Sequence, residues 1–342
     1  MAVTIRNQVQ NGDEWNEWST ILDGVIYDSD IQQNKYDDLV KAMAVEMKSK
    51  RWGEKATTIG GLGDFNSKNE GNDAADDTYV EGYSKFIEHI TFAKDFSISK
   101  EMRDDRQLAE AKTKAQNFVQ AYKRTRAKLL SNAITASVGT ATTLTVKDET
   151  GADKAIDITG ADGLALFHAE HPLKNPATPT NISNLYSNEL GSNSRILNIL
   201  SNKMRNFTDD RGEVLGYDAD TIILPGNDPE YEDFVKRIIG SEGEVGSNNN
   251  DINTQRGRWK LVVDYLWQVD SGHPFILMSS AALKGLMGTR FYDREPLSII
   301  NEVKISSRNL VYNGFGRMSV GFTNWRHVLM GGSSDASATT IS

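Results

Sequence analysis

The amino-acid sequence predicts an α+β protein that combines an extended β-hairpin, a long helix and a mixed region of short helices and strands. Three observations carry this prediction. Large apolar residues occupy even positions between residues 86 and 98, as in a strand with one buried face. Apolar residues recur at helical spacing from residue 99 to 132. Between residues 221 and 240, a short apolar strand leads directly into a strongly capped helix.

The N-terminal segment, residues 1–48, is expected to be an arm that ends in a helix. The stretch up to about residue 35 is polar, with scattered aromatic residues. After it, apolar residues follow one another at intervals of three and four, which is the spacing of one helix face. These residues are Tyr36, Leu39, Val40, Met43 and Met47.

Residues 49–98 are expected to form the hairpin. Residues 52–59 have the character of its first strand, and the even-position pattern that ends at Ile98 indicates the second. Between them the sequence is rich in glycine and acidic residues and has almost nothing to bury, so we expect a flexible tip. The candidate residues for contact with another subunit through this loop are Gly60, Gly61, Gly63 and Asp64.

Residues 99–132 are expected to form one helix, which would be roughly 50 Å long at the usual rise per residue. Ser99 can cap its start, acidic residues follow in the first turn, and basic residues gather near its end, as the helix dipole favours. Such a helix is long for a compact enzyme core and is typical of a strut.

The rest of the chain is expected to be mixed. Asp228 followed by Pro229 marks the start of a helix that ends at Gly240, because a capping carboxylate and a proline at the first position favour a helix N-terminus. A second helix is expected at 194–207, and residues 240–257 are expected to be a mobile loop. Strands are expected at 140–146, 155–159, 221–224, 259–267, 274–279, 297–305 and 309–321.

Composition excludes several classes of protein. The 342 residues include no cysteine, which excludes a disulfide framework, a thiolate metal site and a cysteine nucleophile. No apolar run approaches the roughly 20 residues of a membrane span, and the first residues lack the pattern of a secretory signal, so we expect a protein made in a cytosol. A net charge of −9 excludes a surface that binds nucleic acid all over.

The sequence offers little that points to catalysis. His168 and His171 have a spacing that would let them share a metal ion on a helix, but no other ligand clusters near them, and a structural histidine pair is the favoured interpretation. No serine-hydrolase elbow and no phosphate-binding loop occur. We therefore predict a protein that is not an enzyme and has no catalytic residue, cofactor or metal, with a His168/His171 metal-dependent hydrolase as the weaker alternative.

Charge is unevenly distributed along the chain. Residues 99–132 hold nine basic and four acidic residues, whereas residues 64–81 hold six acidic residues and one lysine, Lys68. The basic helix is either a solvated face with local ion pairs or a surface that meets DNA phosphates non-specifically, and its candidate DNA-facing residues are Lys112, Lys123 and Arg126. The acidic tip is either a solubilising loop or an arm that binds a neighbour's basic surface.

The order of these elements resembles the major capsid proteins of tailed bacteriophages, which have the Hong Kong 97 type fold. Four segments carry the resemblance: YVEGYSKFIEHITFAKDFSISKEMRDD at 79–105, DGLALFHAEHP at 162–172, DRGEVLGYDADTIILPGNDPEYEDFVKRII at 210–239 and GFGRMSVGFTNWRHVLMG at 314–331. Within that group the sequence is most similar to the Mu-type major head subunits, although Asn324 stands where an acidic residue would be expected.

The resemblance implies a division of the chain. It gives an N-terminal arm and helix at 1–48, an extended loop (E-loop) hairpin at 49–98, a spine helix with the peripheral domain at 99–225, an axial domain at 226–305, closing strands of the peripheral domain at 306–330 and a polar tail at 331–342.

It also implies a function. The protein would be the major head subunit of a tailed double-stranded DNA phage or prophage. It would be assembled in the host bacterial cytoplasm into an icosahedral shell of hexamers and pentamers, the virion capsid. Its partners would be itself, scaffolding protein, portal, a maturation protease and non-specifically bound DNA, with no membrane. An encapsulin-like compartment that encloses a protein cargo is the alternative with the same architecture.

Overall fold

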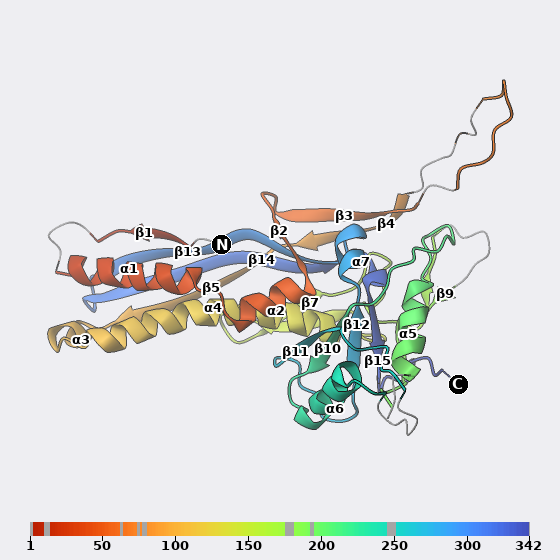
Figure 1. The fold of residues 1–342 in the computed structure, drawn as a ribbon. Coiled ribbons are helices and arrows are strands. Elements are labelled where there is room, and N and C mark those ends of the chain that lie inside the picture. Colours follow the sequence, from red (N-terminus) through yellow and green to blue (C-terminus); the bar gives the residue numbers. More distant parts are fainter. Residues whose placement is uncertain are drawn as a thin grey trace. The chain divides into compact units, whose positions relative to one another are not determined.

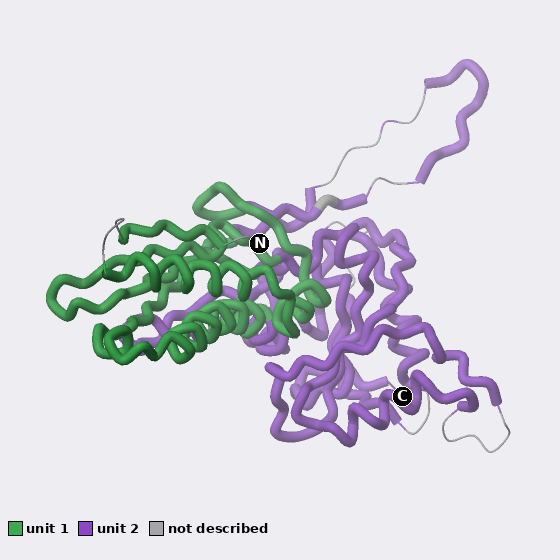
Figure 2. Tube along the Cα trace, turned by 60° about the vertical axis from the view of Figure 1, so that its left-hand side comes forward, with its two compact units in different colours: residues 1–54, 87–130, 291–320 green, residues 55–86, 131–290, 321–342 purple. Residues whose placement is uncertain are grey.

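The computed structural model describes residues 3–9, 14–61, 64–73, 76, 81–174, 181–191, 195–244 and 251–341. The chain divides into two compact units, each built from segments that are distant in the sequence (Figure 2). Unit 1 comprises Met1–Glu54, Ile87–Leu130 and Phe291–Val320. Unit 2 comprises Lys55–Phe86, Ser131–Arg290 and Gly321–Ser342.

Unit 1 is built on a five-stranded sheet that runs β1-β13-β14-β5, with β2 also paired to β13 (Figure 1). Its strands are β1 (Thr4–Asn7), β2 (Val45–Lys48), β5 (Ile90–Ile98), β13 (Thr289–Lys304) and β14 (Asn309–Phe322). Its helices are α1 (Asn16–Ile31), α2 (Lys35–Met43), α3 (Lys100–Asp104) and α4 (Leu108–Ala136), of which α4 continues into unit 2. The long antiparallel β5–β14 pairing aligns Ile98 with Leu310 and Ile90 with Met318.

The core of unit 1 lies between the sheet and the helices α1 and α4. Its members include Leu22 and Ile26 from α1, Phe118 from α4, and Leu297 and Tyr312 from β13 and β14. These side chains come from four separate elements of the chain, so their burial removes a continuous apolar surface from water and stabilises the unit as a whole.

Unit 2 contains a four-stranded sheet in the order β11-β10-β12-β15, with β10 and β11 parallel and the other neighbours antiparallel. Its strands are β10 (Thr221–Pro225), β11 (Lys260–Asp264), β12 (Phe275–Met278) and β15 (Val328–Gly331). The helices of this unit are α5 (Arg195–Arg205), α6 (Pro229–Gly240) and α7 (Ser280–Gly285), with a short 3-10 helix at Trp325–His327. Every residue of β10 and β12 is buried, as expected for central strands.

Three two-stranded sheets complete the described fold. They are β3 (Gly53–Ile59) with β4 (Glu81–Glu88), β6 (Thr143–Lys147) with β7 (Asp153–Asp157), and β8 (His171–Pro172) with β9 (Asn181–Ile182). The polar C-terminal segment is bound in unit 2: the backbone of Thr339 exchanges hydrogen bonds with Leu185 and Ser187, and the Asn188 side chain pairs with the backbone of Ile341.

Several predicted elements are confirmed. The helix that follows Asp228 runs over Pro229–Gly240, and the Asp228 side chain accepts a hydrogen bond from the backbone N–H of Tyr231. The helix predicted at 194–207 is α5, and a hairpin is present within 49–98 as the β3–β4 pair, with a shorter second strand than predicted. The six-part division of the chain by family resemblance stays a prediction.

Residues 99–132 were predicted to form one long helix, but the structure has two helices, α3 and α4. The predicted helix breaks at 105–107, where Arg106 has a φ of 55°, so that α3 and α4 are separate. Ser99 does cap α3, because its hydroxyl accepts a hydrogen bond from the Met102 N–H. The second piece extends to Ala136, four residues beyond the predicted end.

The second strand of the hairpin was also predicted too long. It ends at Glu88, and β5 leaves the hairpin to join the sheet of unit 1. His89 lies at this break and is buried, with its two ring nitrogens 2.8 Å from Ser319 Oγ and 2.9 Å from Ser49 Oγ. Phe86 therefore does not share the buried face of Ile90 and Ile98 and is 46% exposed.

Two other predictions about order were wrong. Helix α1 lies in the polar stretch for which no helix was predicted, and Met47 belongs to strand β2 instead of the preceding helix. Part of the loop predicted at 240–257 is ordered: Asn253 and Gln255 are buried, and the Asn253 amide donates to the carbonyls of Ile238 and Ser241.

Candidate functional site

Two lysines of unit 2 anchor the β3–β4 hairpin close to where its tip begins. We call this part of the paired strands the hairpin base. Lys85 Nζ on β4 lies 3.1 Å from Asp157 Oδ1 and donates to the backbone carbonyl of Thr159 at 2.5 Å. The Lys85 side chain is almost fully buried, and this burial lowers its pKa against the opposing effect of Asp157. Lys174 Nζ donates to the carbonyl of Gly82 at 2.6 Å. The base of the hairpin is thus held by charge-assisted hydrogen bonds, one exposed and two partly buried.

Glycines let the hairpin base approach its surroundings closely. A Cβ on Gly61 would lie 2.3 Å from Asp209 Oδ2, and one on Gly82 would lie 2.1 Å from Thr58 Oγ1. The neighbouring Asp210 pairs with Arg326 at 2.8 Å, and both of these side chains are buried. A larger residue at Gly61 would have to displace Asp209, which accepts hydrogen bonds from three local backbone N–H groups, and one at Gly82 would have to displace Thr58.

The predicted intersubunit residues therefore separate into two groups. Gly60 is buried and Gly61 packs on Asp209, so both belong to the hairpin base. Asp64 is exposed in the tip, and Gly63 lies outside the described residues.

The described part of the tip, residues 64–73 and 76, is exposed throughout. Its acidic residues are Asp64, Glu70, Asp73 and Asp76, against a single lysine, Lys68. Phe65 has 106% relative exposure, which is unusual for an aromatic side chain that would gain free energy by leaving water. The prediction from sequence missed Phe65, although it is the one aromatic residue between Gly60 and Tyr79.

Other large apolar side chains are also exposed. Trp52 and Phe86 lie at the β3–β4 hairpin, Tyr27 and Ile31 lie one turn apart on α1, and Ile305 lies in the β13–β14 turn. Exposed apolar side chains of this size are candidates for contact with another protein chain.

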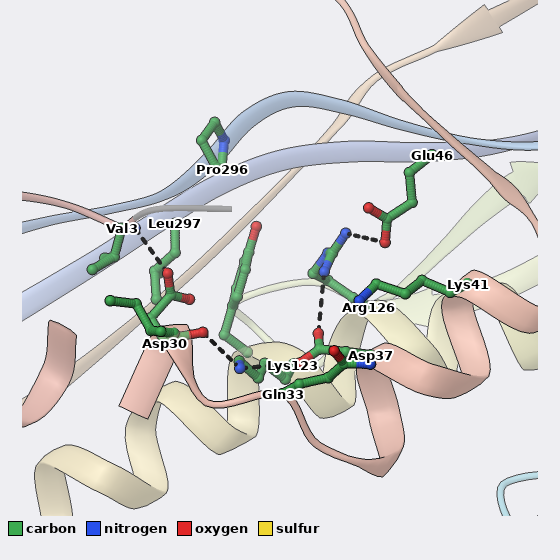
Figure 3. Close-up of a pocket in the computed structure, with 12 residues that line it drawn as sticks. Val3, Asp30, Gln33, Asp37, Lys41, Glu46, Lys123, Arg126, Pro296 and Leu297 are labelled. Carbon is green, nitrogen blue, oxygen red and sulfur yellow. Dashed lines mark hydrogen bonds and ion pairs between the residues drawn. The ribbon is translucent and has the colours of Figure 1, made fainter. Parts of the chain in front are cut away.

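The basic pair Lys123 and Arg126 was predicted to face DNA, and this placement is wrong. Both side chains are buried in unit 1, where they line a cavity of about 120 Å³ together with Asp30, Asp37 and Glu46 (Figure 3). Lys123 Nζ donates to the backbone carbonyls of Asp30 at 2.8 Å and Gln32 at 2.6 Å, and it lies 3.0 Å from Asp37 Oδ2.

Arg126 is the second cation of this cluster. Its Nη2 lies 2.9 Å from Asp293 Oδ2 and 3.4 Å from Glu46 Oε1, and its Nη1 lies 3.6 Å from Asp37. Burial raises the pKa of Asp293 to about 6, although the positive charge of Arg126 lowers it. The cluster joins α2, β2, α4 and β13, so these cations have a structural role within the subunit.

The remaining basic residues of α4 differ from this pair. Lys112 is half-buried, while Lys114, Arg124 and Lys128 are exposed. The prediction that Lys112 faces DNA stays a prediction.

The two histidines considered for a metal site lie outside any helix. His171 is fully buried in β8, with Nδ1 2.6 Å from Asp162 Oδ2 and Nε2 3.2 Å from Asn184 Oδ1. Its ring stacks on Trp325 with the centroids 4.3 Å apart. His168 Nδ1 accepts a hydrogen bond from the Glu170 N–H. Both ring nitrogens of His171 are thus directed at protein acceptors, and the described residues contain no group of three metal-ligating side chains.

No helix within the described ranges has both the length and the apolar character that crossing a membrane requires. This agrees with the absence of any long apolar run in the sequence.

Comparisons with known proteins place these features in a family. The family described as phage capsid protein matches residues 82–330, which is most of the chain. No curated protein matches the sequence.

Two solved structures share the fold. The capsid of an empty GTA particle has a TM-score of 0.53 at 8% identity, with 88% of this chain and 90% of that chain covered. Mycobacterium phage Patience has a TM-score of 0.50 at 11% identity, with 99% of this chain and 95% of that chain covered. The fold is therefore the Hong Kong 97 type expected from the order of elements. The match over residues 82–330 shows that this chain belongs to the phage capsid protein family.

Proposed function

We propose that this protein is the major head subunit of a tailed double-stranded DNA bacteriophage and that many copies assemble into an icosahedral shell. The family match over residues 82–330 carries the proposal. The fold supports it, because a hairpin with a rigidly anchored base and an exposed tip is suited to reach a neighbouring subunit.

Two large apolar side chains are almost fully exposed in the single subunit and could be buried by neighbouring copies. Phe65 is fully exposed, and Ile305 is 94% exposed. Burying such side chains against other copies would add to the association free energy, and many equivalent contacts in a closed lattice would add cooperatively. Shell subunits bury large interfaces of this kind, which a single chain cannot supply.

We further propose the finer features that the sequence resemblance implies. The shell would be of the Mu type and would contain hexamers and pentamers assembled in the host bacterial cytoplasm. Scaffolding protein, portal and a maturation protease would take part in assembly. The segments at 79–105 and 210–239 support this proposal, since they follow one another in the order found in Mu-type head subunits.

Contact with packaged DNA is proposed to be weak and non-specific. The chain carries a net charge of −9, and two of the three predicted DNA-facing cations are buried in ion pairs. Exposed Lys114 and Lys128 with half-buried Lys112 remain on α4 for phosphate contact. Each phosphate contact adds to the salt-sensitive affinity for DNA, so a small number of contacts per subunit keeps DNA weakly held, which suits a container that must release its contents.

Electron microscopy tests the proposal. The purified full-length protein at high concentration should form closed icosahedral particles in negative stain, and particles from the source cells should contain nuclease-resistant DNA. Closed particles that hold a protein cargo and no DNA would support the encapsulin-like alternative. Tubes, or a protein that stays monomeric under every assembly condition, would overturn the proposed function.

A further inference from the structure

Phe65 is an aromatic side chain that none of the described residues covers. It is fully exposed, it follows the acidic Asp64, and every described residue around it from 64 to 73 is exposed as well. Water-exposed aromatic side chains of this kind are the usual anchors of protein interfaces, because each buries a large area when a pocket accepts it.

Unit 1 contains a groove of suitable size and chemistry. It has a volume of about 160 Å³ and lies between β5, α4, β13 and β14. Its apolar lining comes from Phe92, Phe118, Ala121 and Leu297, and Gly314 adds no side chain. A cavity of roughly 150 Å³ lined by apolar side chains accepts a benzene ring, so a single phenyl side chain fits a space of this size.

Glycine at position 314 shapes this groove. A Cβ there would lie 2.3 Å from Phe118 Cζ, so the phenyl ring of Phe118 rests directly on the backbone of β14. The sheet can therefore approach α4 closely at Gly314, which lines the groove together with Phe118.

The charges on the two surfaces are complementary. Lys94 on β5 and Arg124 on α4 line the groove, and both are exposed. The tip around Phe65 carries Asp64 and Glu70 with further acidic residues beyond them. A tip that brings Phe65 to the groove would bring Asp64 close to these two cations, which favours this partner and this orientation.

We propose that Phe65 of one copy inserts into the groove between β5 and α4 of a second copy, with Asp64 beside Lys94 and Arg124. The inference rests on the proposed function, and it names the residues through which two neighbouring subunits contact each other.

Disulfide trapping tests the contact directly, because the chain has no cysteine of its own. A Phe65→Cys, Ala121→Cys double variant of the full-length protein should form intersubunit disulfides in assembled particles under mild oxidation. These disulfides would appear as covalent multimers on a non-reducing gel. The matched control is Phe65→Cys with Ile305→Cys, which places the second thiol at another exposed apolar position. The control should not form multimers.

Charge reversal provides a second test that does not depend on thiols. Arg124→Glu should impair assembly, and Asp64→Lys in the same chain should restore it. Phe65→Ala should raise the protein concentration needed for assembly by roughly tenfold or more while leaving the monomer folded.

The outcomes separate this inference from the proposed function. If the wild-type protein forms particles but the Phe65→Cys, Ala121→Cys variant does not cross-link, the docking contact is overturned and the capsid function stands. The same conclusion follows if the control variant cross-links equally. Failure of the wild-type protein to form any shell would instead count against the proposed function.

Discussion

Arg126 Nη2 lies 2.9 Å from Asp293 Oδ2, and both side chains are almost completely buried, with 7% and 2% of their surfaces exposed. The pair joins α4 to β13 through two residues that lie 167 positions apart in the sequence. It belongs to the same cluster as Lys123, Asp37 and Glu46. The basic residues of this helix resemble a phosphate-binding surface in the sequence. At positions 123 and 126, however, they form buried ion pairs within unit 1.

We predict that Arg126→Gln destabilises the subunit by about 3–5 kcal/mol, because it leaves the buried carboxylate of Asp293 without its counter-charge. Urea unfolding of the unassembled monomer at pH 7 measures this free energy. Arg124→Gln is the matched control: Arg124 is exposed on the same helix, and its loss should change the unfolding free energy by less than about 0.5 kcal/mol. Equal effects of the two substitutions would contradict the structural role of Arg126.

Two glycines should respond oppositely to alanine. A Cβ on Gly331 would lie 2.3 Å from Cζ of the fully buried Phe275, so Gly331→Ala should destabilise by about 1–3 kcal/mol. Gly24 lies in helix α1 with open space around it, so Gly24→Ala should stabilise by about 0.5–1 kcal/mol. Shifts of the thermal midpoint in opposite directions are the expected result, and a destabilised Gly24→Ala variant would speak against the described course of α1.

His327 should make the stability of the protein depend on pH. It is completely buried, its Nδ1 lies 2.7 Å from the Asn324 carbonyl and its Nε2 lies 2.8 Å from Thr289 Oγ1. Burial lowers its pKa from 6.5 to about 4. Between these values the unfolded chain binds a proton that the folded chain does not, so stability falls as the pH falls from 6.5 toward 4.

The contribution of His327 to this loss should reach about 3 kcal/mol near pH 4, since each unit of pKa difference corresponds to about 1.4 kcal/mol. Urea midpoints measured from pH 7 to pH 4 provide the test. The His327→Asn side chain retains a donor for the Asn324 carbonyl but does not titrate. The urea midpoint of this variant should therefore change less with pH than that of the wild type. Parallel profiles would show that His327 is not the titrating group.

Removal of the hairpin tip should separate folding from assembly. Deletion of residues 64–73 takes away only exposed residues and leaves Lys85, Gly61 and Gly82 at the base intact. The monomer should keep its unfolding free energy within about 0.5 kcal/mol, while the yield of closed particles falls. Particle counts by electron microscopy, together with urea unfolding, measure the two effects. A normal particle yield would show that the tip is not an intersubunit arm.

Local sequence signals predicted some elements well. The helix after Asp228 depends on its own capping residue and on a proline that needs no backbone partner, so the pattern alone was sufficient. Helix α1 was missed because two of its four buried positions are Ser19 and Ser29, which look polar in a periodicity count. Their hydroxyls bond to backbone carbonyls of their own helix, Asn16 and Val25, and this allows their burial.

The candidate site also has one part that the sequence predicted and one part that it did not. The acidic tip and its exposed position could be predicted, since a run of glycine and acidic residues has nothing to bury. The roles of Lys123 and Arg126 could not, because their partners Asp37 and Asp293 come from distant parts of the chain.

By itself, the sequence determined the class of the fold, the order of its main elements, the capped helix of unit 2 and the resemblance to a capsid family. Only the tertiary structure decided where the long helix breaks, which strand leaves the hairpin and which lysines and arginines are exposed. The physical reason is that propensity and capping act over a few neighbouring residues. Burial of a charge or the pairing of a strand depends on groups that meet only after the chain has folded.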